Sequence, residues 1–279
     1  EKTLEAELAE AIRQREEMSG LLADKAAARA AARAEAEASR RTEAMPEGVR
    51  LALVALNECL REDGFVVVGL DRVPSPAADV SVETDLSDLD ALVAVAGELA
   101  GTHAVAAVVH NAAAQPLGGA GEVDPAAWQD AFRVNVLAAD VLVGAFRSRL
   151  ETAGGSVAVV GSVHGRATTR GIAAYATTKA ALEGWVRAAA LDLAPAIRVN
   201  AVVPGAIDTP KLQDGFARWG AQSAAERLQV LLDRTPLHAL GAAADVAAAV
   251  SFLVSDSARF VTGASLVVDG GATTQLGSE

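Results

Sequence analysis

The stretch between residues 156 and 209 constrains the fold more than any other part of the chain. Residues 156–160 form an apolar run typical of a strand buried on both faces, and residues 197–203 are expected to form another strand. The segment between them is long enough for the helix that connects two parallel strands. We therefore expect a parallel sheet whose carboxyl-terminal edge, where open α/β sheets bind ligands, carries the loops after both strands.

Polar side chains gather at this expected edge. Tyr175 and Lys179 lie four residues apart, so on a helix they share one face, and Ser162 directly follows the first strand. The pKa of a free tyrosine is about 10, and an ammonium one helical turn away favours the phenolate form. Tyr175 is also the only tyrosine in the chain. The pattern therefore places a phenol that loses its proton more readily than a free tyrosine beside Ser162, at the edge of the sheet where a ligand is expected.

Taken in order, these residues resemble the short-chain dehydrogenase/reductase family. The matching features are Gly161 with Ser162, Tyr175 with Lys179, the segment 198–205, and the tail 262–271. The resemblance implies an α/β fold, a Rossmann-like doubly wound parallel sheet with helices on both faces. It also implies an NAD(P)-dependent oxidoreductase that interconverts a small secondary alcohol and a ketone by hydride transfer.

The resemblance assigns roles residue by residue. It places Asn135, within a helix expected over residues 125–149, beside Lys179, where it would hold a water that extends the proton path to solvent. Lys179 would also hold the nicotinamide ribose, and Thr209 would contact the carboxamide. Tyr175 would be the general acid in reduction and the general base in oxidation, and Ser162 would donate a hydrogen bond to the substrate oxygen. The catalytic set that the resemblance implies is Asn135, Ser162, Tyr175 and Lys179. The expected cofactor-binding residues are Asp71, Asp85, Asn111, Tyr175, Lys179, Pro204, Gly205, Ile207 and Thr209.

Two acids bear on the choice of cofactor. Asp71 follows a strand expected at 65–70, where the family contacts the adenosine ribose, and an acid there favours NAD over NADP, although Arg72 beside it opposes this choice. Asp85 follows a strand expected at 78–83 and either meets the adenine or caps the helix from Asp88. The family has an Asn-Asn-Ala-Gly motif after its fourth strand. Asn111 corresponds to the second asparagine of this motif, and His110 replaces the first asparagine.

The amino-terminal edge departs from the family, because its first strand and Gly-rich turn are not visible. Gly20, Gly48 and Gly64 cannot form that turn. If residues 51–56 were the first strand, only residues 57–64 would remain for the crossover to the next parallel strand, which is too short, so residues 49–63 are predicted as a helix. Since this strand is central in the family, three explanations stay open. Residues before Pro46 are omitted from the sequence; an unusual pairing, the arm or a neighbouring chain fills the gap; or the fold no longer holds a pyrophosphate on helix amides.

Residues 1–44 are expected to form a helical arm ahead of a Rossmann domain at 45–279. The arm consists mainly of Ala, Glu and Arg, and its sparse apolar stripe suits either docking and oligomerisation or packing on its own domain. We expect a homo-oligomer, either a dimer or a tetramer, for which the arm is one candidate interface. The alternative to an enzyme is a non-catalytic scaffold or regulatory subunit that binds a partner through this arm.

Composition excludes several other classes. The formal charge of −12 argues against nucleic acid or an anionic membrane as partner. No apolar run reaches the length of a membrane span, and the single Cys59 suits a reducing cytoplasm. Four scattered histidines offer no ligand spacing, so no catalytic metal is expected. His164 is either a substrate contact or a loop residue, and residues 211–234 correspond to the substrate-covering lid of the family.

Overall fold

The computed structural model describes residues 47–75, 77–217 and 221–275; the predicted arm lies outside them. In this part of the chain all paired strands are parallel. A two-stranded sheet pairs β1 (Val68–Asp71) with β2 (Val80–Glu83). A four-stranded sheet has the order β3 (Ala107–His110), β4 (Ser156–Val160), β5 (Arg198–Pro204) and β6 (Ser265–Val268).

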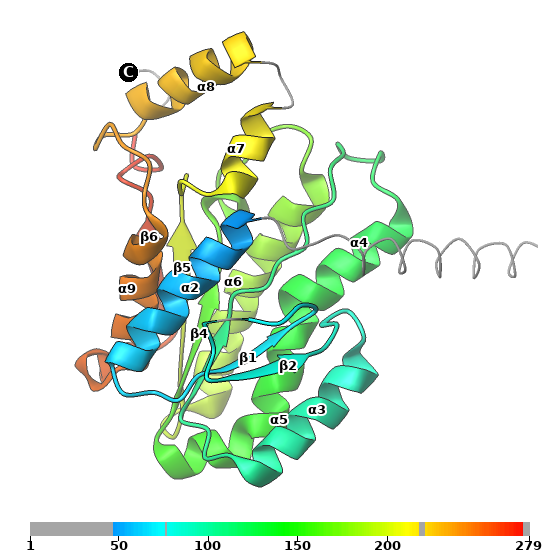
Figure 1. Ribbon diagram of the computed structural model, residues 1–279, viewed down its shortest axis with the longest axis vertical. Helices are drawn as coiled ribbons and strands as arrows, with labels where there is room; N and C mark the ends of the chain where they lie inside the picture. The colour runs from blue at the N-terminus through cyan, green and yellow to red at the C-terminus, as the bar shows by residue number, and fades with distance from the viewer. Residues whose placement is uncertain (1–46, 76, 218–220, 276–279) are drawn as a thin grey trace, which may run out of the picture. The chain divides into compact units, whose positions relative to one another are not determined.

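Helices cover both faces of the four-stranded sheet (Figure 1). Val157 and Val159 of β4 pack in one core with α3 (Leu89–Thr102), α5 (Ala138–Ala153) and α6 (Ala173–Leu193). Ala158, which points to the opposite face, packs in a second core with α2 (Glu47–Glu62) and α9 (Ala243–Val254). This alternation explains why both faces of β4 are apolar, and it confirms the predicted doubly wound α/β fold.

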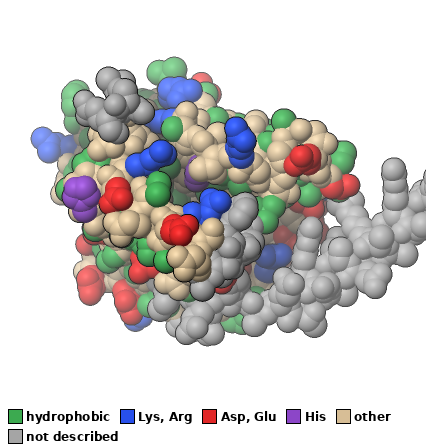
Figure 2. Space-filling view, turned by 90° about the horizontal axis from the view of Figure 1, so that it is seen from above, with side chains coloured by type: hydrophobic (Ala, Val, Ile, Leu, Met, Phe, Trp, Pro, Cys, Tyr) green, Lys and Arg blue, Asp and Glu red, His purple; other side chains and the backbone are tan. Residues whose placement is uncertain are grey.

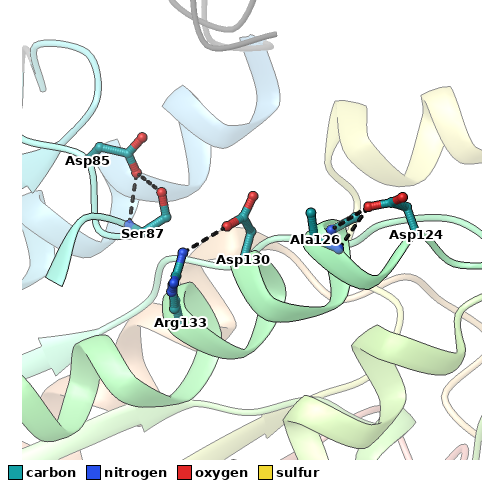
Figure 3. Close-up of polar contacts among 7 residues, drawn as sticks. Asp85, Ser87, Asp124, Ala126, Asp130 and Arg133 are labelled. Atoms are coloured by element: carbon teal, nitrogen blue, oxygen red, sulfur yellow. Dashed lines mark hydrogen bonds and ion pairs between the residues drawn. The ribbon is translucent and has the colours of Figure 1, made fainter. Parts of the chain in front are cut away.

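The helix predicted over residues 125–149 has three parts. Asp124 caps α4 (Pro125–Phe132) by accepting hydrogen bonds from backbone amides that include Ala126, as Figure 3 shows. A π-helical segment, Arg133–Leu137, then joins α4 to α5, so the residues after Phe132 are shifted relative to a regular α-helix. Asn135 lies in this segment.

The lid region contains α7 (Pro210–Ala217) and α8 (Ala221–Asp233). A short turn, Val163–Gly165, follows β4, and another, Asp256–Ala258, follows α9.

The sheet is split at the place where the sequence lacks a strand. The helix α2 leads through Gly64, which has a φ of 89°, directly to β1. Among the described residues no strand lies between β1 and β3, and each of these strands is at the edge of its own sheet. The prediction that residues 51–56 are helical rather than the first strand is confirmed.

Candidate active site

The first turns of α6 bring Tyr175 and Lys179 to the carboxyl end of β4. Tyr175 is 9% exposed and Lys179 only 1%. The Lys179 Nζ donates a hydrogen bond of 2.6 Å to the Val160 carbonyl and lies 5.7 Å from the centroid of the Tyr175 ring. The two residues therefore share one buried face, as their spacing predicts.

Ser162 lies next to this pair, in the segment that follows β4. Its Oγ accepts a hydrogen bond of 3.2 Å from the His164 amide, which starts the turn Val163–Gly165. Gly165 allows that turn to pack tightly on α6, because a Cβ there would lie 3.0 Å from the Ala180 nitrogen. The Ser162 hydroxyl is close enough to Tyr175 to lower the pKa of the phenol through a hydrogen bond.

Burial, however, has the larger effect on Tyr175. It raises the pKa of the phenol above its usual value, and the hydrogen bond with Ser162 offsets this only in part. Burial, and then the charge of Lys211, lowers the pKa of Lys179 to about 7. The expected lowering of the Tyr175 pKa by Lys179 is therefore not found in the structure, because desolvation dominates both groups. Tyr175 is protonated at neutral pH.

Asn135 is fully buried and connects α6 to the loop after β3. Its Oδ1 accepts a hydrogen bond of 2.7 Å from the Ala114 amide, and its Nδ2 donates to the Ala114 carbonyl at 2.9 Å and to Thr178 Oγ1 at 2.8 Å. Thr178 in turn donates to the Tyr175 carbonyl at 2.9 Å. The amide thus fixes the start of α6, and its predicted link to Lys179 through water stays a prediction.

His110 is a buried neighbour whose importance the sequence did not reveal. Burial, followed by the charge of Lys179, lowers its pKa to about 4, so the imidazole is neutral at physiological pH. Its Nε2 is buried and has no hydrogen-bond partner among the described residues. The departure from the family motif at this position was the available signal.

Four of the expected cofactor-binding residues line one cavity of about 150 Å³. Asn111, Pro204, Ile207 and Thr209 surround it at the carboxyl ends of β3 and β5, together with apolar residues of α2 and α9. Val160, the residue that accepts the hydrogen bond from Lys179, also lines it. The sequence-based grouping of these residues therefore corresponds to one place in the structure.

Gly205 has a packing role beside this cavity. A Cβ at this position would lie 2.6 Å from the Cβ of Asp269, so only glycine lets the turn after β5 approach the end of β6. Thr209 accepts a hydrogen bond of 3.4 Å from the Leu212 amide at the start of α7. Neither Leu212 nor Leu228 of the lid lines the cavity.

The two acids expected at the adenosine lie at the ends of β1 and β2. Asp71 is partly buried, which raises its pKa, and its Oδ1 accepts a hydrogen bond of 2.6 Å from the Arg72 amide. Asp85 is exposed and accepts from both the amide and the hydroxyl of Ser87 at 2.8 Å (Figure 3). Asp88, not Asp85, caps α3, so the N-cap alternative for Asp85 is wrong.

Comparison with known proteins decides the family. A family model described as enoyl-(acyl carrier protein) reductase, one of the short-chain dehydrogenase/reductase models, matches residues 23–273. The chain is a short-chain dehydrogenase/reductase. By family it is an NAD(P)-dependent oxidoreductase.

Individual proteins are similar to this chain over different shares of its length. An uncharacterized oxidoreductase of Mycobacterium tuberculosis is 45% identical over 147 residues, which cover 52% of this chain and 53% of that protein. The chain thus spans about half the length of that relative. 2-(S)-hydroxypropyl-CoM dehydrogenase 3 of Xanthobacter autotrophicus is 32% identical over 232 residues, covering 82% and 89%. A solved gluconate 5-dehydrogenase of Burkholderia cenocepacia, in complex with NADP and tartrate, superposes with a TM-score of 0.72 at 25% identity, covering 80% and 91%.

The residues of this short-chain dehydrogenase/reductase suit one end of a nicotinamide cofactor. Asn111, Ile207 and Thr209 line the cavity next to Val160 and Lys179, where polar groups and apolar walls together suit a nicotinamide and its ribose. The described residues contain no Gly-rich turn between a strand and a helix, so they form no amide cradle for the pyrophosphate.

The described part of the chain has neither a metal-binding cluster nor a membrane-spanning helix. It contains no cluster of three or more His, Cys, Asp or Glu side chains arranged to hold a metal ion. No helix in it has the length and apolar character needed to cross a membrane.

Proposed function

We propose that this short-chain dehydrogenase/reductase interconverts a secondary alcohol and a ketone, with Tyr175 as the proton donor in reduction and the proton acceptor in oxidation. The observation that carries the proposal is the buried arrangement of Ser162, Tyr175 and Lys179 at the carboxyl end of β4. The names of two relatives, which act on a hydroxypropyl compound and on gluconate, support an alcohol as substrate class.

Each side chain has a separate task in this proposal. Ser162 donates a hydrogen bond to the reacting oxygen and stabilises the charge that develops there. Tyr175, which is neutral at neutral pH, transfers its proton to that same oxygen. Lys179 holds the ribose of the cofactor, and Asn135 keeps α6 in register with the loop after β3. The nicotinamide supplies or accepts the hydride when it is bound.

The proposed cofactor is NAD in preference to NADP. The support is Asp71 at the end of β1, because a carboxylate at that place repels the 2′-phosphate of NADP. The related gluconate 5-dehydrogenase was solved with NADP, so the two cofactors need a direct comparison. We also propose that the protein is a homo-oligomer, which light scattering would measure. It is proposed to act on a small molecule in the cytoplasm, and cell fractionation would measure this location.

Cofactor binding provides the first test. The purified chain, with its intact mass verified as 28.4 kDa, is titrated with NADH and with NADPH while tryptophan fluorescence is followed. Saturable binding with preference for NADH is the expected result. A chain of the stated mass that binds neither cofactor would refute the redox proposal and favour the non-catalytic scaffold.

Substitution of Tyr175 provides the second test. Tyr175→Phe removes the proton donor but keeps the ring, so we expect turnover of alcohols to fall by about 10²- to 10⁴-fold while NADH affinity stays within about threefold. Thr177→Ala is the matched control, since Thr177 lies on the same helix, is exposed and bonds only to the Ala173 carbonyl among the described residues. Equal turnover by Tyr175→Phe and the control would contradict the assigned role.

A further inference from the structure

A second lysine reaches the Tyr175 ring from the lid. Lys211 lies in the first turn of α7, and its Nζ is 5.2 Å from the centroid of the Tyr175 ring. The Lys179 Nζ lies 5.7 Å from the same centroid. The imidazole of His164 packs edge-on against this ring, with the ring centroids 6.2 Å apart. Three nitrogen-bearing side chains therefore surround one phenol.

No carboxylate among the described residues balances these charges. No ion pair to Lys211 or Lys179 is formed there. Glu183, the buried acid of α6, is bound by Arg166 through three hydrogen bonds of 2.5 to 3.2 Å. Burial alone lowers the pKa of Lys211, and the charge of Lys211 in turn lowers the pKa of both Lys179 and His164. The site thus carries uncompensated positive charge.

Lys211 also remains accessible. Its surface as a whole is exposed, although its ammonium is close to enough protein atoms for burial to lower its pKa. Figure 2 views the end of the molecule that carries α7 and α8 and shows a hollow with a histidine in its depth and Lys or Arg side chains at its border. The buried Nδ1 of His164 has no hydrogen-bond partner among the described residues. Lys211 is therefore available to a ligand, and His164 adds a ring nitrogen without a partner near it.

An anion is the ligand that this arrangement favours. The Lys211 ammonium opposes a proton on Lys179, and a partly desolvated cation without a partner is unfavourable. A carboxylate bound to the Lys211 ammonium would relieve both effects, with His164 as a second hydrogen-bond donor. Because Lys211 lies over the ring whose hydroxyl meets the reacting oxygen, the carboxylate and the reacting carbon would belong to one small molecule.

We infer that Lys211 is a specificity-determining residue that binds the carboxylate of the substrate, so that the enzyme acts on hydroxy acids or oxo acids. This inference rests on the proposed function, because it concerns the substrate of the same site. It assigns α7 a role in recognition, while proton transfer stays with Tyr175.

The test compares substrates that differ only in charge. Three pairs are offered with the cofactor: gluconate and gluconamide, 3-hydroxybutyrate and 3-hydroxybutyramide, and cis-4-hydroxycyclohexanecarboxylate and its carboxamide. In Lys211→Met we expect kcat/KM for the best carboxylate to fall by about 10- to 100-fold, with that for its carboxamide within about threefold. Lys211→Arg keeps the charge, so its kcat/KM for the carboxylate should be closer to that of the unmodified protein than the value for Lys211→Met. Arg187 is exposed and lies 12 residues after Tyr175 on α6, so Arg187→Met should change kcat/KM for neither the carboxylate nor the carboxamide of a pair.

A binding measurement separates this inference from the proposed function. Calorimetry with cyclohexanecarboxylate and cyclohexanecarboxamide, which have no hydroxyl to oxidise, should show preference for the anion that Lys211→Met abolishes. If no alcohol is turned over but this preference persists, the proposed function fails and the anion site stands. If Lys211→Met affects carboxylates and carboxamides alike, or neither, the inference is wrong whether or not the protein is an active enzyme.

Discussion

The substitution Asn135→Ala tests how far the site depends on a single buried amide. Asn135 has no exposed surface, and its side chain makes three hydrogen bonds, two to Ala114 and one to Thr178. Alanine leaves the Ala114 amide, the Ala114 carbonyl and the Thr178 hydroxyl each without this partner. At about 1 kcal/mol for each group, the lower end of the range because Ala114 is only half-buried, the free energy of unfolding should fall by about 3 kcal/mol.

Urea unfolding followed by tryptophan fluorescence measures this change. With a slope of about 3 kcal/mol per M, a loss of about 3 kcal/mol moves the midpoint down by about 1 M. Thr177→Ala, one residue before Thr178 but exposed, should change the free energy of unfolding by less than about 0.5 kcal/mol. The double substitution Asn135→Ala with Thr178→Val should be less destabilising than the sum of its parts, because both remove the same hydrogen bond.

A midpoint for Asn135→Ala within about 0.2 M of the unmodified protein would refute this reasoning. It would mean that water replaces all three hydrogen bonds without loss, and the connection between α6 and the loop after β3 would then be dispensable. A normal stability combined with lost turnover would instead support the proton path through water that the sequence predicts for this residue.

Three further predictions concern packing, charge and the split sheet. Gly205→Ala should lower the melting temperature, because the added Cβ would lie 2.6 Å from the Cβ of Asp269. Gly144→Ala in α5 should raise the melting temperature slightly, because the added Cβ meets no atom within 4 Å and alanine favours the helix. Equal shifts of the melting temperature would contradict the packing argument. The pKa of Lys179 is about 7 in the folded protein against 10.5 for an ordinary lysine, so the unfolded chain binds more protons between these values. Stability should therefore rise from pH 7 to pH 10 more steeply than in Lys179→Met, and equal slopes would mean that folding does not lower the pKa of Lys179. Hydrogen exchange should be faster in β3, at an edge, than in the central β5, and comparable protection would show that another segment covers β3.

The sequence predicts the region around β4, α6 and β5 well because its signals are local. An apolar run is typical of a strand buried on both faces, and β4 occurs where this run lies, while β5 occurs where the second strand is predicted. Tyr175 and Lys179 share a face because helical periodicity requires it. Ser162 follows from its position after a strand, which fixes the edge of the sheet on which it lies.

Features that depend on tertiary contacts escape such reasoning. Nothing in residues 133–137 distinguishes a π-helix from an α-helix, since the hydrogen bonds of Asn135 to Ala114 arise only in the folded chain. Asp85 and Asp88 have the same side chain three residues apart, and only the backbone geometry decides that Asp88 caps α3. Lys211 lies 36 residues after Tyr175 in the sequence, so its position over the Tyr175 ring becomes visible only in three dimensions.

The division of the sheet suggests that proton transfer and cofactor affinity are separable in this protein. Every contact that defines the Tyr175 site, including those of Asn135, Lys179 and Lys211, arises within the four-stranded sheet and its helices. Asp71 lies on the separate two-stranded sheet, across the place where the family has its first strand. A change at the gap should therefore alter affinity for the adenosine end of the cofactor while the hydrogen bonds around Tyr175 remain. Conversely, the hydrogen bonds and ring contacts around Tyr175 should stay the same however the gap is closed, because none of them involves β1 or β2.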